Sequence, residues 1–276
     1  MSAIEQAPSV TAGISPRRIG ALILRYVYLL RSSWPRLLEL AYWPILQVVI
    51  WGFISRFFVT NSTWVAQAAG VLLGAAMLWD VLFRSQLGVS VSFLEEMWSR
   101  NLGHLFVSPL RPYEFVVAIL TMSVIRTTIG MLPAALIAIP LYHFSIFDLG
   151  LPLLAFFVNL MVTGWSIGIA VSGLILRYGL GAETFAWVAV FAISPLAAIY
   201  YPVTVLPPWL QTVALALPPA HVFEGMRALM FDHVFRLDHF AAAAGLNAVM
   251  IGVAGTIFLL AFARARQLGK LMQMGE

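Results

Sequence analysis

The chain has 276 residues, of which 61% are hydrophobic and only 10% are charged, and its mean hydropathy is +0.91. A soluble domain carries about a quarter charged residues, so this composition cannot build a water-facing surface and predicts an integral membrane protein. The net charge is +4 at pH 7, and the absence of cysteine excludes disulfides, thiolate metal sites and cysteine nucleophiles.

The N-terminal region is predicted to comprise a disordered tail, residues 1–14, and an amphipathic helix, residues 15–38. The tail lacks the apolar core of a cleaved signal peptide. Ser15 and Pro16 form a favourable helix start. We expect the helix to lie in the membrane interface with its apolar face in lipid, either as an anchor or as a lever joining a partner to the first span. That face comprises Ile19, Leu22, Ile23, Tyr26, Leu29 and Leu30.

Six later stretches hold the roughly 20 apolar residues that a helix needs to cross a bilayer. These predicted transmembrane helices are Leu40–Phe58, Val65–Val91, Phe115–Leu141, Leu151–Leu176, Phe185–Val205 and Phe240–Phe262. A further apolar region, residues 206–230, is interrupted by two proline pairs, which break helices. We expect it to form two short helices that enter the membrane and return, as a re-entrant hairpin before the last span.

The arginines and lysines predict the orientation, because cytoplasmic loops carry an excess of them. With six spans, both termini and the loop between the second and third spans share one side, which we expect to be cytoplasmic. A seventh span would move the basic tail, residues 264–276, to the outside. The predicted cytoplasmic side holds Arg17, Arg18, Arg25, Arg31, Arg36, Arg100, Arg111, Arg177, Arg264, Arg266 and Lys270.

The loop between the second and third spans is predicted to contain an amphipathic helix, residues 92–111. Ser92 and Glu95 match the S-x-x-E capping box, and Trp98, Leu102 and Phe106 recur at four-residue steps. Trp98 either contacts a partner or lies at headgroup level as part of an aromatic belt.

Three charged residues fall inside predicted spans. Asp80 and Arg84 share one face of the second span, and Arg126 lies at a similar depth in the third. An unpaired charge is costly at that depth, so we expect Asp80 to contact Arg84, Arg126 or both. The group is either a structural ion pair or a charged lining of a transport route.

The predicted hairpin carries His221, Glu224 and Arg227 at three-residue steps, so they share one side of a short helix. Glu224 and Arg227 are expected to pair and close the hairpin, while Trp209 and Leu210 would shape an outer gate. Too few ligands are evident for a zinc site. The remaining histidines near span ends, His143, His233 and His239, are isolated in the sequence.

The fourth predicted span carries Gly164 and Gly168, with serines and a further glycine nearby. Small residues at this spacing favour close helix packing. We expect the packing to be within the chain.

Two segments together resemble the membrane subunit of type-2 ABC transporters, the bacterial export permeases. FLEEMWSRNLGHLFVSPLRPYEF at Phe93–Phe115 is similar to the family's coupling helix, and YYPVTVLPPWLQTVALALPPAHVFEGMRALM at Tyr200–Met230 is similar to its external re-entrant helices. The resemblance implies a single permease domain, residues 15–263. The expected fold is all-α, with six transmembrane helices, an interface helix, a cytoplasmic coupling helix and a re-entrant hairpin.

The resemblance also implies partners. The chain would pair with a second copy of itself and with two copies of a separate ATPase, in a bacterial cytoplasmic membrane, with membrane lipids around it and no nucleic acid. ATP and magnesium would bind the ATPase, because this chain has no G-x-x-x-x-G-K-[ST] loop. The cargo would be an amphipathic drug, lipid or glycan. The residues docking into the ATPase would be Glu95, Glu96, Met97, Trp98, Arg100 and Asn101.

Two other classes of function are weaker alternatives. A lipid-processing membrane enzyme needs polar groups clustered at one interface, but here they are scattered. An ion-coupled secondary transporter favours repeated halves with broken helices at mid-membrane, and the chain has one broken region near one face.

Overall fold

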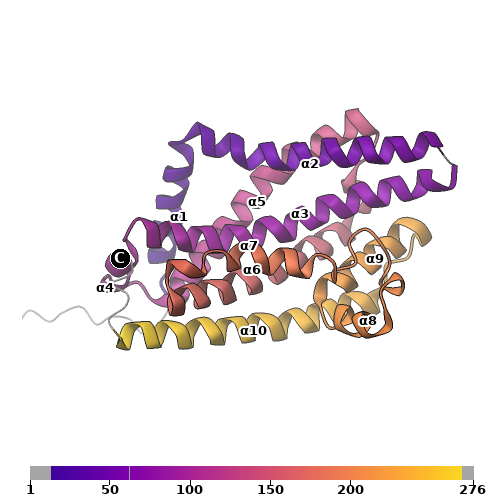
Figure 1. The fold of residues 1–276 in the computed structure, drawn as a ribbon. Coiled ribbons are helices and arrows are strands. Elements are labelled where there is room, and N and C mark those ends of the chain that lie inside the picture. Colours follow the sequence, from indigo (N-terminus) through magenta and orange to yellow (C-terminus); the bar gives the residue numbers. More distant parts are fainter. Residues whose placement is uncertain (1–13, 62, 269–276) are drawn as a thin grey trace, which may run out of the picture.

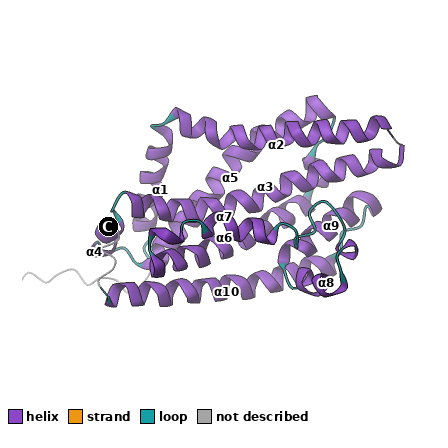
Figure 2. Ribbon diagram, viewed as in Figure 1, coloured by secondary structure: helices purple, strands orange, loops and turns teal. Residues whose placement is uncertain are grey.

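The computed structural model describes residues 14–61 and 63–268, which form a helical bundle without a strand in that part of the chain. Five helices are long and apolar enough to cross a membrane, and Figures 1 and 2 show them running along a common axis. They are α2 (Trp34–Asn61), α3 (Thr63–Trp98), α5 (Pro112–Tyr142), α6 (Leu151–Tyr178) and α10 (Leu237–Gln267).

Shorter elements lie at the ends of this bundle or along it. The α-helices are α1 (Pro16–Arg31), α4 (Leu102–Val107), α7 (Phe185–Ile193), α8 (Pro208–Leu215) and α9 (Pro218–Asp232). The 3-10 turns are η1 (Ile146–Leu149), η2 (Leu180–Ala182) and η3 (Val203–Val205). In Figure 1, α1 and α4 lie at one end, hereafter the α4 end, and α8 and α9 lie at the other, hereafter the α8 end.

The centre of the bundle is formed by α3 and α6, which are mostly buried, whereas α2 and α10 are largely exposed. Close packing of α3 and α6 depends on glycine. A Cβ atom on Gly164 would lie 2.7 Å from the Leu82 carbonyl oxygen, and one on Gly168 would lie 2.7 Å from the Val89 Cβ. The expectation that these glycines pack within the chain is confirmed.

A buried polar cluster joins α6 to α10. The Asn247 side-chain amide donates to the Asn159 carbonyl and side-chain oxygens, both at 3.0 Å. The Thr163 hydroxyl in turn donates to the Asn247 side-chain oxygen at 2.8 Å. Because these groups satisfy one another, the cluster can hold two apolar helices in register inside a membrane.

The chain travels the length of the bundle between α6 and α10, since α6 ends at the α4 end and α10 begins at the α8 end (Figure 1). The start of α2 and the end of α10 therefore lie at the same end, as expected for termini on one side. The predicted fifth span, Phe185–Val205, occupies this connection. The prediction of one continuous helix over this range is wrong, because α7 ends at Ile193 and is only about 13 Å long.

The physical reason for the break lies in the sequence. Pro195 and Pro202 have no amide hydrogen, so neither can donate a helical hydrogen bond. The following residues form turns, and the helical conformation ends at Ala198, whose φ is 52°. The carbonyl oxygens of Ala198 and Ile199 are then bonded by the Arg227 guanidinium of α9, at 2.8 and 3.2 Å. A side chain thus replaces the missing helix partners.

The N-terminal helix differs from expectation in its surroundings. α1 ends at Arg31 and crosses the α4 end at an angle to the long helices (Figure 1). Leu22 and Tyr26 are buried against the bundle core and Leu30 is buried too, while Tyr28 is exposed. The prediction that the Leu22 face lies in lipid is therefore wrong. Residues 1–13 of the predicted disordered tail lie outside the described residues. The predicted basic tail also lies outside them from residue 269 onward.

Candidate coupling surface, intramembrane charges and hairpin

The polar insert is built differently from the predicted helix over residues 92–111. α3 runs on without interruption to Trp98, and only the six residues Leu102–Val107 form α4. Ser92 is buried inside α3, where its hydroxyl accepts a hydrogen bond from Arg126 at 3.0 Å. The capping-box interpretation is wrong, because Ser92 does not begin a helix.

A Schellman motif ends α3. The Asn101 amide donates to the Glu96 carbonyl at 3.0 Å, and the Arg100 amide donates to the Met97 carbonyl at 2.9 Å. Arg100 occupies the left-handed position of this motif with φ of 53°, where glycine is usual. The turn is therefore fully hydrogen-bonded, and it fixes the direction in which α4 leaves α3.

Glu96 is the centre of the contacts beneath this turn, although only 2% of it is exposed. It accepts hydrogen bonds from the Tyr26 hydroxyl at 2.7 Å and from the Asn101 side chain at 2.6 Å, and it pairs with Arg25 at 3.0 Å. Burial and, next, the Glu96 charge raise the pKa of Tyr26 far above its ordinary value, so the hydroxyl remains a donor. Glu96 thus ties α3 and the turn to α1.

A second buried carboxylate ties α1 to α5. Glu114, fully buried, accepts from the Arg18 Nε at 2.9 Å and from its Nη2 at 2.7 Å, a bidentate arrangement. It also accepts from the Ser15 and Arg111 backbone amides, at 2.8 and 3.0 Å. The helix starts of α1 and α5 therefore share one acceptor. Nothing local in the sequence signals this contact, because Arg18 and Glu114 are 96 residues apart.

The residues left on the surface of the turn are fewer than expected. Trp98 is 50% exposed and Arg100 is exposed, whereas Glu96 and Met97 are buried. The expectation that Glu96 and Met97 contact a partner directly does not fit this burial. Their side chains support the turn, which leaves Trp98, Ser99 and Arg100 as its exposed residues.

The charged residues expected within the spans form two separate pairs. The Arg84 Nε lies 2.6 Å from the Asp80 Oδ2, as the four-residue spacing predicts, and both side chains are largely buried. Arg126 does not join them. It reaches toward the α4 end and pairs with Glu95 at 3.4 Å. The burial of Asp80 and Arg84 fits a structural ion pair.

At the α8 end, Glu224 and Arg227 pair at 3.0 Å, the contact expected from their three-residue spacing. Glu224 also accepts from the Val203 amide at 2.6 Å. The pair therefore holds the broken connection after α7 as well as α9. Trp209 is exposed and Leu210 partly buried, both in α8. Their predicted role in a gate stays a prediction.

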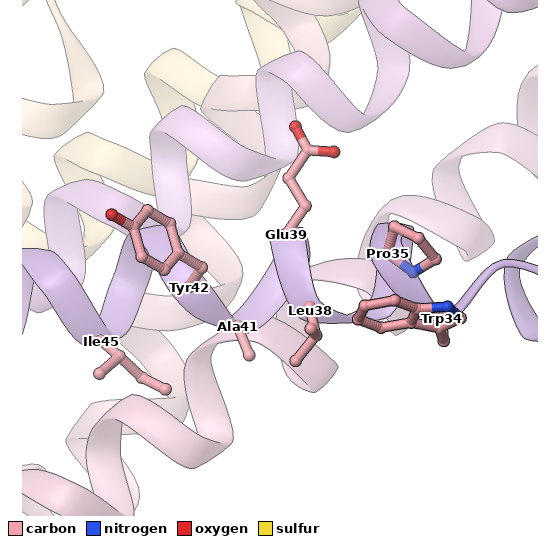
Figure 3. Close-up of a pocket in the computed structure, with 7 residues that line it drawn as sticks. All are labelled: Trp34, Pro35, Leu38, Glu39, Ala41, Tyr42 and Ile45. Carbon is pink, nitrogen blue, oxygen red and sulfur yellow. The ribbon is translucent and has the colours of Figure 1, made fainter.

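The outer face of α2 carries an open, apolar groove of about 520 Å³, shown in Figure 3. Trp34, Leu38 and Tyr42 line it and are each more than half exposed. Among residues 14–61 and 63–268, no group of three or more His, Asp or Glu side chains lies close enough together to hold a metal ion.

The described residues thus form a multi-pass helical bundle with a polar turn at one end and a broken helical segment at the other. The ABC-2 type transporter family matches residues 27–231, well over half of the chain. The chain belongs to this family and is the permease component of an ABC transporter. No curated protein matches it.

Proposed function

We propose that this chain is the permease subunit of an ATP-driven exporter in the cytoplasmic membrane of a bacterium. Two copies would pair with each other and with two copies of a separate ABC ATPase. Both termini and the α4 end would face the cytoplasm. The cargo would be an amphipathic drug, lipid or glycan.

One observation carries this proposal: the exposed turn around Trp98 and Arg100 is anchored to three helices. Glu96 links the turn to α1, and Glu114 links α1 to α5. A partner that moved this turn would therefore move α1, α3 and α5 together. A simple loop between two spans would not need such anchoring.

The proposed mechanism is mechanical. ATP-driven closure of the two ATPase subunits would displace the turn and α4, and the attached helices would shift. Since α3 also packs against α6 through Gly164 and Gly168, the displacement would reach the centre of the bundle. The two permease copies would then separate enough to admit cargo between them.

Pairing of two copies is supported by the exposed apolar face of α2. This face includes the groove at Trp34, Leu38 and Tyr42 and continues to Phe53 and Phe57. Large aromatic side chains of this kind are enriched in protein interfaces.

The test of ATPase coupling is to purify the full chain with the ATPase from the same cell. We expect Trp98→Ala and Arg100→Asn each to weaken ATPase binding by about thirtyfold, the effect of losing a hot-spot residue of about 2 kcal/mol. Trp209→Ala, at the α8 end, is the matched control and should bind normally. If Trp98→Ala binds the ATPase as tightly as Trp209→Ala, the α4 end is not the docking surface.

Export is tested with the same proteins in inside-out vesicles. ATP should drive accumulation of a fluorescent amphipathic cargo, and Trp98→Ala should slow accumulation in proportion to its loss of ATPase binding. Accumulation that proceeds without ATP and collapses with the ion gradient would instead identify an ion-coupled transporter.

A further inference from the structure

Two histidines meet at the α8 end. His221 of α9 and His239 of α10 are 18 residues apart in the sequence, and their Nδ1 atoms lie 3.1 Å apart. Their ring centroids are separated by 5.4 Å, with the rings tilted by 48°. Both side chains are partly buried. Two imidazoles from different helices thus present the same atom to one point.

The hydrogen-bond partners determine which nitrogen atoms carry hydrogen. The His221 Nε2 lies 2.8 Å from the Leu215 carbonyl oxygen, which can only accept, so Nε2 carries the hydrogen. In the neutral ring the His221 Nδ1 then carries a lone pair and no hydrogen, and the His239 Nδ1 donates its hydrogen to that lone pair. A single hydrogen atom separates two potential ligand atoms.

We propose that His221 and His239 form a two-imidazole site for a divalent transition metal such as Zn²⁺ or Cu²⁺. Zinc–nitrogen bonds of about 2.0–2.1 Å at a tetrahedral angle place two ligand nitrogens about 3.3 Å apart. The observed 3.1 Å is close to this separation. On binding, the His239 Nδ1 releases its hydrogen to solvent while its Nε2 takes one up, so each ring keeps one N–H. Small rotations of the rings then turn both Nδ1 lone pairs toward the metal.

The contacts around His221 also resemble those of metal-bound histidines. Such a histidine almost always donates its second ring nitrogen to a backbone carbonyl, a carboxylate or water, which orients the ring. The bond from the His221 Nε2 to Leu215 meets this requirement in advance. It further connects the site to the last turn of α8, so a bound metal would join α8, α9 and α10.

The nearest carboxylates already have partners. Glu224 accepts from the Val203 amide and pairs with Arg227, and Asp238 pairs with Arg236 at 2.8 Å. The two remaining coordination positions therefore belong to water. With only two protein ligands, the site binds more weakly than a four-ligand structural zinc site. Its effect is to clamp the hairpin against α10, the last long helix.

The test is calorimetric titration of the full chain in lipid nanodiscs with ZnCl2 and with CuCl2 at pH 7.5. We expect one site per chain. His221→Gln and His239→Gln should each weaken it at least about tenfold, because a single imidazole remains. The control is His143→Asn, which removes another imidazole, and asparagine tolerates the left-handed backbone at that position (φ 53°).

Two results would overturn the site. One is a double variant, His221→Gln with His239→Gln, that binds metal as the unmodified chain does. The other uses the unmodified protein, so it does not depend on a variant folding: an electron paramagnetic resonance spectrum of bound Cu²⁺ that lacks two imidazole nitrogens. The melting temperature without metal shows whether each variant is folded.

Discussion

Glu96 shows how one side chain can determine the shape of the α4 end. It is buried in a membrane protein, and Tyr26, Arg25 and Asn101 all contact its carboxylate. Two of these partners come from α1 and one from the turn after α3. A carboxylate in this position therefore specifies a contact between segments 70 residues apart.

The contribution of Tyr26 can be measured with Tyr26→Phe, which removes only the hydroxyl. Hydrogen bonds to charged groups contribute about 2 kcal/mol, so we expect the melting temperature of the purified chain to fall by about 5 °C. Tyr28→Phe, on the exposed side of the same helix, should leave it unchanged. Equal melting temperatures for the two variants would show that the Tyr26 hydroxyl does not stabilise Glu96.

Arg100 combines an unfavourable backbone conformation with an exposed charge. Arg100→Asn and Arg100→Val both remove the guanidinium, but asparagine tolerates φ near +53° and valine does not. We expect the valine variant to be about 1–2 kcal/mol less stable in thermal or denaturant unfolding. ATPase binding should fall in both. If the two variants unfold alike, the turn does not hold the left-handed conformation.

At the scale of elements, the contact between α3 and α6 has little room for added volume. Gly164→Ala would place a Cβ atom 2.7 Å from the Leu82 carbonyl oxygen, which belongs to the rigid backbone. We expect a loss of about 1–3 kcal/mol, measured as a lower melting temperature.

The matched control for this substitution is Gly252→Ala in α10, where a Cβ would meet nothing within 4 Å. It should be neutral or slightly stabilising, because alanine favours helix over glycine by about 1 kcal/mol. An unaffected Gly164→Ala protein would mean that α3 and α6 are farther apart than described.

The long helices could be predicted from the sequence because their signal is local. The predicted spans Phe115–Leu141 and Leu151–Leu176 lie within α5 and α6 and end within three residues of them. α7 could not be separated from its continuation by hydropathy, because the whole run is apolar. Pro195 and Pro202 were the available signals. In a helix the Ala198 carbonyl would accept from residue 202, which as proline has no amide hydrogen, and Arg227 bonds this carbonyl instead.

The candidate site was predicted less completely, for a different reason. Asp80–Arg84 and Glu224–Arg227 follow from helical spacing, which is visible in the sequence. Contacts between segments that are distant in the sequence are not visible in this way. Arg126 was one of two partners considered for Asp80 because their depths match, but its long side chain reaches Glu95 instead. Depth along a helix does not determine where a flexible side chain ends.

For the whole molecule, the path of the chain is testable because the sequence contains no cysteine. Single cysteines can be introduced at Arg177, in the last turn of α6, and at Thr212, in α8, where both residues are exposed. A membrane-impermeant maleimide applied to intact cells should label Thr212→Cys and not Arg177→Cys, which should react only after permeabilisation. Labelling of both from one side would show that the connection through α7 does not cross.

The continuity of α3 from Thr63 to Trp98 has a mechanical consequence. A helix of 36 residues is about 54 Å long, which exceeds the full thickness of a bilayer of about 45 Å. Such a helix can carry a rotation of the turn at Trp98 across the membrane as one continuous arm. If a partner rotated the turn, and α3 with it, by about 5°, the far end of α3 would move by about 5 Å, close to the diameter of a hydrocarbon chain. A small rotation of the turn would thus become, at the other end of α3, a displacement large enough for cargo.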